Sequence, residues 1–139
     1  MSPSWHAMAS RGRVVHGYKD LEVWQKAVDL VVDTYRITKQ FPSDERFGLV
    51  VQLRRASISI ASNIAEGRGR FGLGSFLYHL SVATGSLMEV ETQFLISERL
   101  GYLDAAQAKA VLGEIAEVRR LLGGMVRALR TKAEQATTR

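Results

Sequence analysis

The sequence predicts an all-α protein, a single-domain, antiparallel up-down-up-down four-helix bundle. Apolar residues recur at three- and four-residue steps over four long segments that short links separate, a pattern typical of such bundles. The two prolines, Pro3 and Pro42, leave long stretches free to form helices. No credible strand pair and no repeat of fixed period occurs. At 139 residues the chain is long enough to bury one hydrophobic core without disulfides.

The first helix is expected at about residues 20–40. Asp20 has the chemistry of an N-cap, because its carboxylate can accept a hydrogen bond from the first helical turn. Phe41 and Pro42 end the helix, since the residue before a proline avoids the α-helical region. The apolar stripe consists of Leu21, Trp24, Ala27, Val28, Val31, Val32 and Tyr35.

The second helix is expected to begin at Ser43 or Asp44 and to end at Glu66. Polar and acidic residues at its start suit the positive end of a helix, and Gly67 follows as a natural C′ residue. The alternation at residues 57–60 would also suit a strand, but the longer helical stripe outweighs it. That stripe consists of Leu49, Leu53, Ala56, Ile60 and Ile64.

The last two helices are expected at about residues 75–100 and 104–130. Gly101 closes the third helix, and Asp104 is the predicted N-cap of the fourth. The third stripe consists of Phe76, Leu80, Ala83, Leu87, Val90 and Phe94. The fourth consists of Ala108, Val111, Leu112, Ile115, Val118, Leu122, Met125, Val126 and Leu129.

The two ends of the chain are expected to lie outside the bundle, which spans residues 18–131. Residues 1–17 have no clear periodicity and predict a flexible N-terminal arm. Residues 132–139 lack apolar anchors and are expected to fray. The N-terminus has no apolar segment of a secretory signal, and the longest uncharged run, Phe71–Met88, holds three glycines and several polar residues. These features favour a cytoplasmic protein without membrane spans.

The residues that most enzymes use are missing or scattered. The absence of cysteine excludes disulfides, thiol catalysis and thiolate metal sites. His6, His16 and His79 are isolated, and none follows a glutamate by three residues as di-iron bundles require. No Gly-x-Ser-x-Gly motif is present. The sequence therefore predicts no enzyme, no cofactor and no metal site.

A glycine-rich stretch at residues 67–72 fits the pattern G-x-G-x-x-G. A dinucleotide-binding fingerprint requires a preceding strand, whereas this stretch follows a helix, so dinucleotide binding is rejected. The glycines with Arg68 and Arg70 could still hold a phosphate group. The alternative is a flexible connection that carries two solvated arginines.

An uncharged segment on the second helix, Ala56–Ala65, is unusual for the outside of a monomeric bundle. We expect one side to face the core and the other to form a subunit interface, with the N-terminal arm as the alternative cover. Asn63 and Glu66 are expected to be structural, the first satisfying a buried group and the second pairing with an arginine. The expected interface residues are Ala56, Ser57, Ile58, Ala61, Ser62 and Ala65.

The net charge of +5 points to an anionic partner. The excess lies in residues 1–19, with +3, residues 46–70, with +4, and residues 119–139, with +5, while residues 20–45 and 71–118 are acidic. Arginine outnumbers lysine, and its planar fork suits phosphate. Phe71 is the main aromatic residue near these charges, so base stacking is not favoured. The expected nucleic-acid-binding residues are Arg54, Arg55, Arg68, Arg70, Arg119, Arg120, Arg127 and Arg130.

Two functions follow from this charge pattern. The first is a non-enzymatic bundle that binds nucleic acid, in particular RNA, through contacts to phosphates. The second is an interaction scaffold that docks an acidic or polymerase-like protein. Basic residues near the end of the last helix would also complement the helix dipole without any partner.

Several segments resemble, in order, the bacterial family of 23S rRNA intervening-sequence proteins, also called S23 ribosomal proteins. The matching stretches are YKDLEVWQKA at 18–27, QLRRASISIASNIAEG at 52–67, SLMEVETQ at 86–93 and GYL at 101–103. The resemblance covers roughly residues 18–130, and Ala61 replaces a proline that is common in the family.

This resemblance implies a four-helix bundle that assembles as a ring-like homopentamer and has no known catalytic activity. The family is similar to the accessory protein of diversity-generating retroelements, which forms a basic pentamer and binds nucleic acid and a reverse transcriptase. The resemblance therefore agrees with the two functions that the charge pattern suggests.

Overall fold

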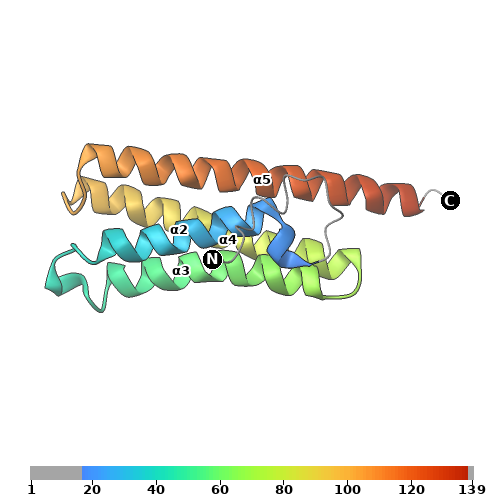
Figure 1. Cartoon of the computed structure of the whole chain (residues 1–139), viewed down its shortest axis with the longest axis horizontal. Coiled ribbons are helices and arrows are strands. Elements are labelled where there is room, and N and C mark those ends of the chain that lie inside the picture. Colours follow the sequence, from blue (N-terminus) through green and yellow to red (C-terminus); the bar gives the residue numbers. More distant parts are fainter. Residues whose placement is uncertain (1–16, 138–139) are drawn as a thin grey trace, which may run out of the picture.

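A computed structural model describes residues 17–137, which form four long helices packed against one another (Figure 1). The long helices are α2 (Glu22–Thr38), α3 (Leu49–Gly69), α4 (Leu73–Arg99) and α5 (Ala105–Thr137), with short 3-10 turns η1 (Tyr18–Asp20) and η2 (Ser43–Glu45). Consecutive helices pack together, and α2 also packs against α5. The predicted all-α, four-helix fold is confirmed. The arm predicted at residues 1–17 lies, except for Gly17, outside the described residues.

The hydrophobic core runs along the centre of the bundle and comes mainly from the predicted stripes of α3, α4 and α5. Its largest fully buried side chains are Phe94, Leu30, Leu53, Ile60, Ile64, Leu80, Leu87, Ile115, Leu122, Val90, Val111 and Val118. Burial of these apolar side chains supplies the dominant favourable term in folding.

The stripe predicted for α2 lies mostly on the side that faces the core, although two of its residues, Val32 and Tyr35, are exposed. Val23, Ala27 and Leu30 are buried together with Thr34, whereas Tyr35 is exposed. Thr34 can be buried because its hydroxyl donates to the carbonyl of Leu30 at 2.7 Å, which satisfies the hydroxyl within the helix. The α2 helix is therefore apolar on a second side, which faces outward.

Helix α3 begins later than the sequence predicts. The residues from Ser43 form a single 3-10 turn, and the helix proper starts at Leu49. The Glu45 carboxylate accepts a hydrogen bond from the Leu49 amide at 3.3 Å and another from the Tyr102 hydroxyl at 2.8 Å. The cap thus comes from Glu45, which also ties this turn to the link between α4 and α5.

Of the two other predicted N-caps, Asp20 and Asp104, only Asp104 caps a helix. The prediction for Asp20 is wrong, because α2 begins at Glu22 and has no side-chain cap. The prediction for Asp104 is confirmed: its carboxylate accepts from the Gln107 amide at 2.8 Å, and the Gln107 side chain accepts from the Asp104 amide at 3.1 Å. This reciprocal pair is a capping box.

The turn between α3 and α4 begins later than predicted, and its glycines have other roles than ending the helix at Gly67. Gly67 does not end α3, which continues to Gly69. A Cβ atom at Gly67 would lie 2.7 Å from the Cβ of His79, so this glycine allows α3 and α4 to approach closely. Gly72, with φ of +96°, reverses the chain just before α4.

Helix α5 extends to Thr137 and includes most of the tail that was expected to fray. Residues 138–139 lie outside the described part of the chain. No helix among the described residues has the length and apolar character that crossing a membrane requires.

Candidate nucleic-acid interface

Several of the eight candidate arginines, Arg68 among them, contact groups of their own chain. Arg54 donates to the Thr38 hydroxyl at 3.0 Å and to the Tyr35 carbonyl at 3.4 Å, and its guanidinium lies 4.4 Å from the centre of the Tyr35 ring. It therefore satisfies groups at the carboxyl end of α2. This position gives Arg54 a structural role in the bundle.

Arg70 and Arg119 form ion pairs at the surface. Arg70 contacts Glu66 at 2.7 Å, and Arg119 contacts Glu91 at 2.6 Å. The hydrogen bond from Arg70 holds the pKa of Glu66 below its usual range, and the nearby His79 acts in the same direction. Exposed pairs of this kind contribute little stability, so both arginines can exchange a carboxylate for a phosphate at small cost.

The remaining candidates lie at different places on the surface. Arg55, Arg120, Arg127 and Arg130 are exposed, and they form no ion pair with other residues in the range 17–137. Arg68 is half-buried at the end of α3. Exposed guanidinium groups without a carboxylate partner are the ones best placed to bind an external anion.

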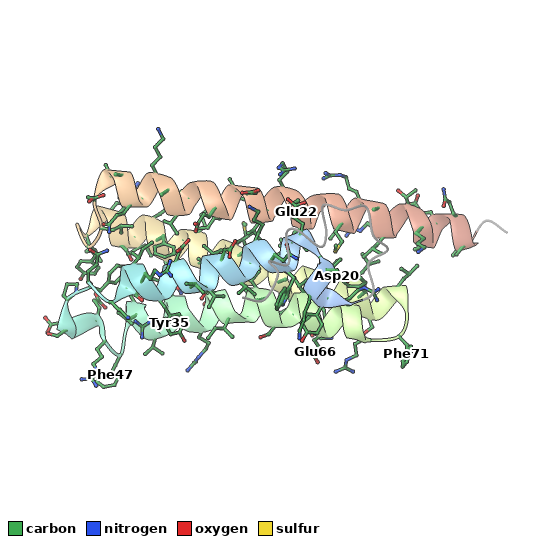
Figure 2. The ribbon with its side chains drawn as sticks, in the orientation of Figure 1. Asp20, Glu22, Tyr35, Phe47, Glu66 and Phe71 are labelled. Carbon is green, nitrogen blue, oxygen red and sulfur yellow. The ribbon has the colours of Figure 1, made fainter. Side chains whose placement is uncertain are left out.

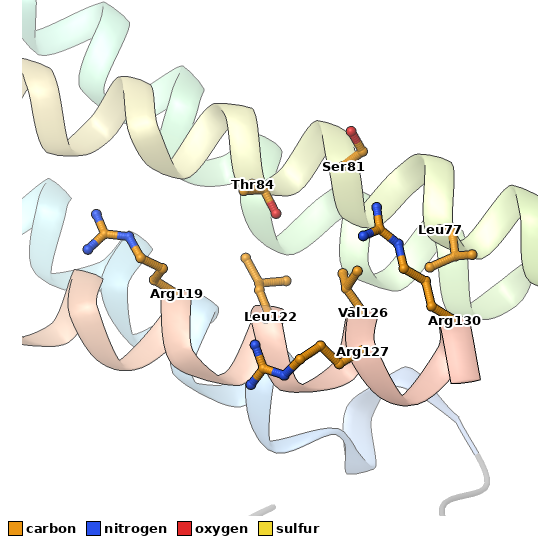
Figure 3. Close-up of a pocket in the computed structure, with 9 residues that line it drawn as sticks. Leu77, Ser81, Thr84, Arg119, Leu122, Val126, Arg127 and Arg130 are labelled. Atoms are coloured by element: carbon orange, nitrogen blue, oxygen red, sulfur yellow. The ribbon is translucent and has the colours of Figure 1, made fainter. Parts of the chain in front are cut away.

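A groove between α4 and α5, here the α4–α5 groove, holds three of these arginines (Figure 3). Arg119, Arg127 and Arg130 surround it, and its volume is about 380 Å³. Figure 3 shows Arg130 extending from α5 toward Ser81 and Leu77 of α4. The floor and walls come from Leu77, Ser81, Thr84, Leu122, Gly123 and Val126. The groove therefore combines a partly apolar floor with a cationic rim.

A second groove, here the turn groove, lies where the α3–α4 turn meets α5. Arg68 and Arg70 line it from the turn and Lys132 lines it from α5, and its volume is about 570 Å³. Its apolar surface comes from Leu21, Leu73, Phe76, Met125 and Leu129. Because α3 and α5 are alternate helices of an antiparallel bundle, their carboxyl ends lie at the same end of the molecule. The two basic segments of the sequence meet in this groove.

The eight candidates do not form one continuous patch. Arg55 precedes Arg68 by 13 residues on the same helix, a separation of roughly 20 Å along its axis. Arg54 and Arg55 instead line a shallow pocket on the outer face of α2 and α3 with Tyr35, Val51 and Ile58. The two cationic grooves therefore involve five of the other six arginines, and Arg54 and Arg55 belong to a different surface. Arg120 lines neither groove and lies beside α2 in a separate pocket.

The expected interface residues are also divided by the structure. Ala56, Ser57 and Ala61 are buried within the chain itself, so they cannot contribute to an outer interface. Ile58 is 42% exposed, Ser62 is exposed and Ala65 is half-buried. The outward surface of α3 therefore includes fewer of the expected interface residues. Val51 of α3 and Tyr35 of α2 lie beside Ile58 and add to this surface.

A polar network connects α3 to α4 beneath the turn; it includes Asn63, for which the sequence predicted a structural role, and His79, whose part in it was not predicted. His79 Nδ1 lies 3.0 Å from Asn63 Oδ1, and the Asn63 amide donates to the Ser59 carbonyl at 2.8 Å. The Ser59 and Ser86 hydroxyls are 2.8 Å apart. No sequence signal pairs His79 with Asn63, because the contact depends on the register of two helices. The network holds the basic turn in place.

The most perturbed acid in the structure lies outside both cationic grooves. Burial raises the pKa of Glu114 to about 8, and a hydrogen bond with Asp33 and the charges of Asp33, Asp29 and Glu117 act in the same direction. These side chains lie along the seam between α2 and α5. Within residues 17–137 no group of histidine or acidic side chains has the arrangement of a metal site.

These features define a class of protein: a four-helix bundle whose notable surface chemistry consists of cationic grooves. Residues 19–124 match the 23S rRNA-intervening sequence protein family, and the chain belongs to this family. No catalytic activity is known for the family.

The fold is shared with a solved structure from the same family. A protein of unknown function from the S23 ribosomal protein family of Bacteroides thetaiotaomicron VPI-5482 has 22% sequence identity and a TM-score of 0.71. The alignment covers 76% of this chain and 95% of that chain. A comparison with curated proteins found no match. The relationship thus establishes the fold, while the function has to be argued from the surface.

Proposed function

We propose that this protein is a non-enzymatic, self-associating bundle that binds RNA through the cationic grooves beside α5. The observation that carries the proposal is the convergence of Arg68, Arg70 and Lys132 in the turn groove. Arg127 and Arg130 precede Lys132 on α5 by less than about two turns. Charges that are far apart in the sequence thereby act on one region of space.

Arginine at these positions suits oxyanions such as the phosphates of a nucleic acid. Its planar fork can donate two parallel hydrogen bonds to phosphate oxygens. Contacts of this kind position a nucleic acid without reading its sequence. The printed name of the family refers to ribosomal RNA, which makes structured RNA the first polyanion to test.

Self-association would multiply the charge of the grooves. The exposed apolar residues on the outer face of α2 and α3, including Ile58 and Tyr35, favour contact with a second copy. The resemblance to the family implies five copies, which would carry about five times the charge of +5 per chain. A polyanion that spans several grooves would bind more tightly than one groove allows.

The test compares RNA binding by the intact protein with binding by the triple variant Arg119→Gln, Arg127→Gln, Arg130→Gln, which removes the three arginines of the α4–α5 groove. We expect micromolar or tighter binding of a labelled RNA hairpin at low salt, measured by fluorescence anisotropy. Loss of three phosphate contacts should weaken binding by at least about tenfold. The matched control is Arg99→Gln, an exposed arginine outside both grooves, which should leave binding unchanged. No binding by the intact protein at micromolar concentration would contradict the proposal.

The α4–α5 groove favours a second candidate, an acidic protein segment. Its apolar residues Leu77, Leu122 and Val126 would contact side chains that a phosphate backbone lacks, while the arginines pair with carboxylates. Affinity capture before and after nuclease treatment separates the candidates. A bound protein that survives nuclease and depends on Arg130 would support the scaffold, whereas loss on nuclease treatment would support RNA.

A further inference from the structure

We propose that Phe71 stacks on an unpaired base, so that the α3–α4 turn selects single-stranded segments of RNA. The proposal rests on the proposed function, because it assigns a substrate class to the same basic region. It also revises the expectation from sequence that base stacking has little part in binding.

The exposure of Phe71 is the first observation. Its side chain is 101% exposed, the largest value among the exposed large hydrophobic residues of the described chain. Figure 2 shows it at the α3–α4 turn, directed away from the bundle. Within residues 17–137 it has no ring or cation contact. Both faces of the ring are therefore available to a ligand.

The turn holds this ring at the tip rather than against the core. Arg70 has extended backbone geometry at the end of α3, and Gly72 adopts φ of +96°, which residues with a Cβ rarely adopt. The chain turns back into α4 immediately after Phe71. The following Leu73 and Phe76 line the turn groove, so Phe71 alone among these apolar residues points outward.

The charges near Phe71 identify the partner. Arg68, Arg70 and Lys132 line the adjacent groove and would attract an anionic backbone. An apolar protein surface would not require these cations, and a bare phosphate would not require the ring. A nucleotide offers both groups, because every base has a π face and every linkage has a charge.

The pairing state of the nucleic acid follows from the geometry of stacking. In a duplex both faces of each internal base are already covered by neighbouring bases, so a side chain at a turn has no base to stack on. Unpaired bases can splay out and stack on an aromatic ring. The combination of an outward ring and a basic groove therefore favours single strands over duplexes.

The chain provides a matched control for this ring. Phe47 is 84% exposed and lies at the opposite end of α3 (Figure 2). Arg46 covers its ring at 5.4 Å, and the acidic residues Asp44 and Glu45 precede it. Phe47 thus has similar exposure without the basic groove, and it should not bind nucleotides.

The experiment measures binding of a labelled oligouridylate of about 12 nucleotides and of a blunt RNA duplex of similar length, each by fluorescence anisotropy at low salt. Phe71→Ala should weaken binding of the single strand by about 5- to 100-fold and leave duplex binding unchanged. Phe71→Trp should retain single-strand binding because the indole also stacks. Phe47→Ala should bind both ligands as the intact protein does.

The outcomes distinguish this inference from the proposed function. Unchanged single-strand binding by Phe71→Ala would overturn the stacking role while the arginine grooves still bind RNA. If the intact protein bound the duplex but not the single strand, the stacking role of Phe71 would likewise be overturned. Binding of neither ligand would overturn both proposals. Phe71 is fully exposed, so a circular dichroism spectrum should show the Phe71→Ala variant folded as before.

Discussion

Glu114 makes the stability of the bundle depend on pH at the scale of a single residue. Its pKa is raised to about 8 in the folded protein, mainly by burial and then by Asp33 and the nearby acids. Below the ordinary carboxyl pKa of about 4.5 the folded and unfolded chains both hold this proton, so no stability is lost. As the pH rises from about 4.5 to 8, the unfolded chain releases this proton, whereas the folded chain must keep it or bury a charged carboxylate. The free energy of unfolding therefore falls over this range.

We therefore expect the free energy of unfolding of the Glu114→Gln variant to decline less between pH 5 and pH 8. At pH 8 the variant should be more stable than the intact protein by about 1 kcal/mol, a value reduced for solvent screening. Urea unfolding at several pH values measures this, with the exposed Glu98→Gln as control. A Glu114→Gln variant with the same pH dependence as the intact protein would contradict the assignment.

Gly67 provides a second test at the residue scale. A Cβ atom there would lie 2.7 Å from the Cβ of His79 and 3.1 Å from Cδ1 of Phe76. Gly67→Ala should destabilise the protein by about 1–3 kcal/mol, although alanine favours helices. Gly85→Ala, where nothing lies within 4 Å, should instead stabilise it by about 0.5–1 kcal/mol. Urea unfolding that shows the same effect for both variants would exclude close packing as the reason for Gly67.

At the scale of the element, the outer face of α3 tests self-association. Ile58 is 42% exposed, and lysine at this position should dissociate the assembly without disturbing the core. Light scattering should then fall from the mass of an oligomer toward 15.4 kDa, the mass of one chain. The control is Leu95→Lys on α4, where leucine is 44% exposed. An intact protein of 15.4 kDa, or equal effects of both variants, would refute this interface.

The helices themselves show what could be predicted from sequence and why the rest could not. The stripes of α3, α4 and α5 identified the core because most of the apolar residues spaced at three- and four-residue steps on these helices are buried. The α2 stripe included Val32 and Tyr35, which are exposed, and it missed Thr34, a polar residue that occupies a core position. The start of α3 was misplaced because its cap, Glu45, bonds to Tyr102, which is distant in sequence.

The candidate site was predictable in composition but not in arrangement. The sequence locates the arginines, yet ion pairs such as Arg119 with Glu91 depend on which helices pack together. The contact between His79 and Asn63 likewise depends on how α3 and α4 pack together. Exposure of Phe71 could not be predicted either, because it depends on the geometry of a turn in which Gly72 adopts φ of +96°.

At the scale of the whole molecule, the antiparallel topology gathers the positive charge. The carboxyl ends of α3 and α5 lie at one end of the bundle, so residues 46–70 and 119–139 contribute to the same groove (Figure 1). Basic residues there also complement the helix dipoles. The number and exposure of the arginines on α5 go beyond that requirement, since the dipole acts mainly within the last turn.

The dependence of RNA binding on salt tests the central claim most directly. Each phosphate contact contributes about −0.7 to −0.9 to the slope of the logarithm of the binding constant against the logarithm of salt concentration. We expect a steep negative slope for the intact protein and a slope shallower by about 2–3 for the Arg119, Arg127 and Arg130 triple variant. A slope near zero, or the same slope for both proteins, would contradict phosphate binding by the grooves beside α5.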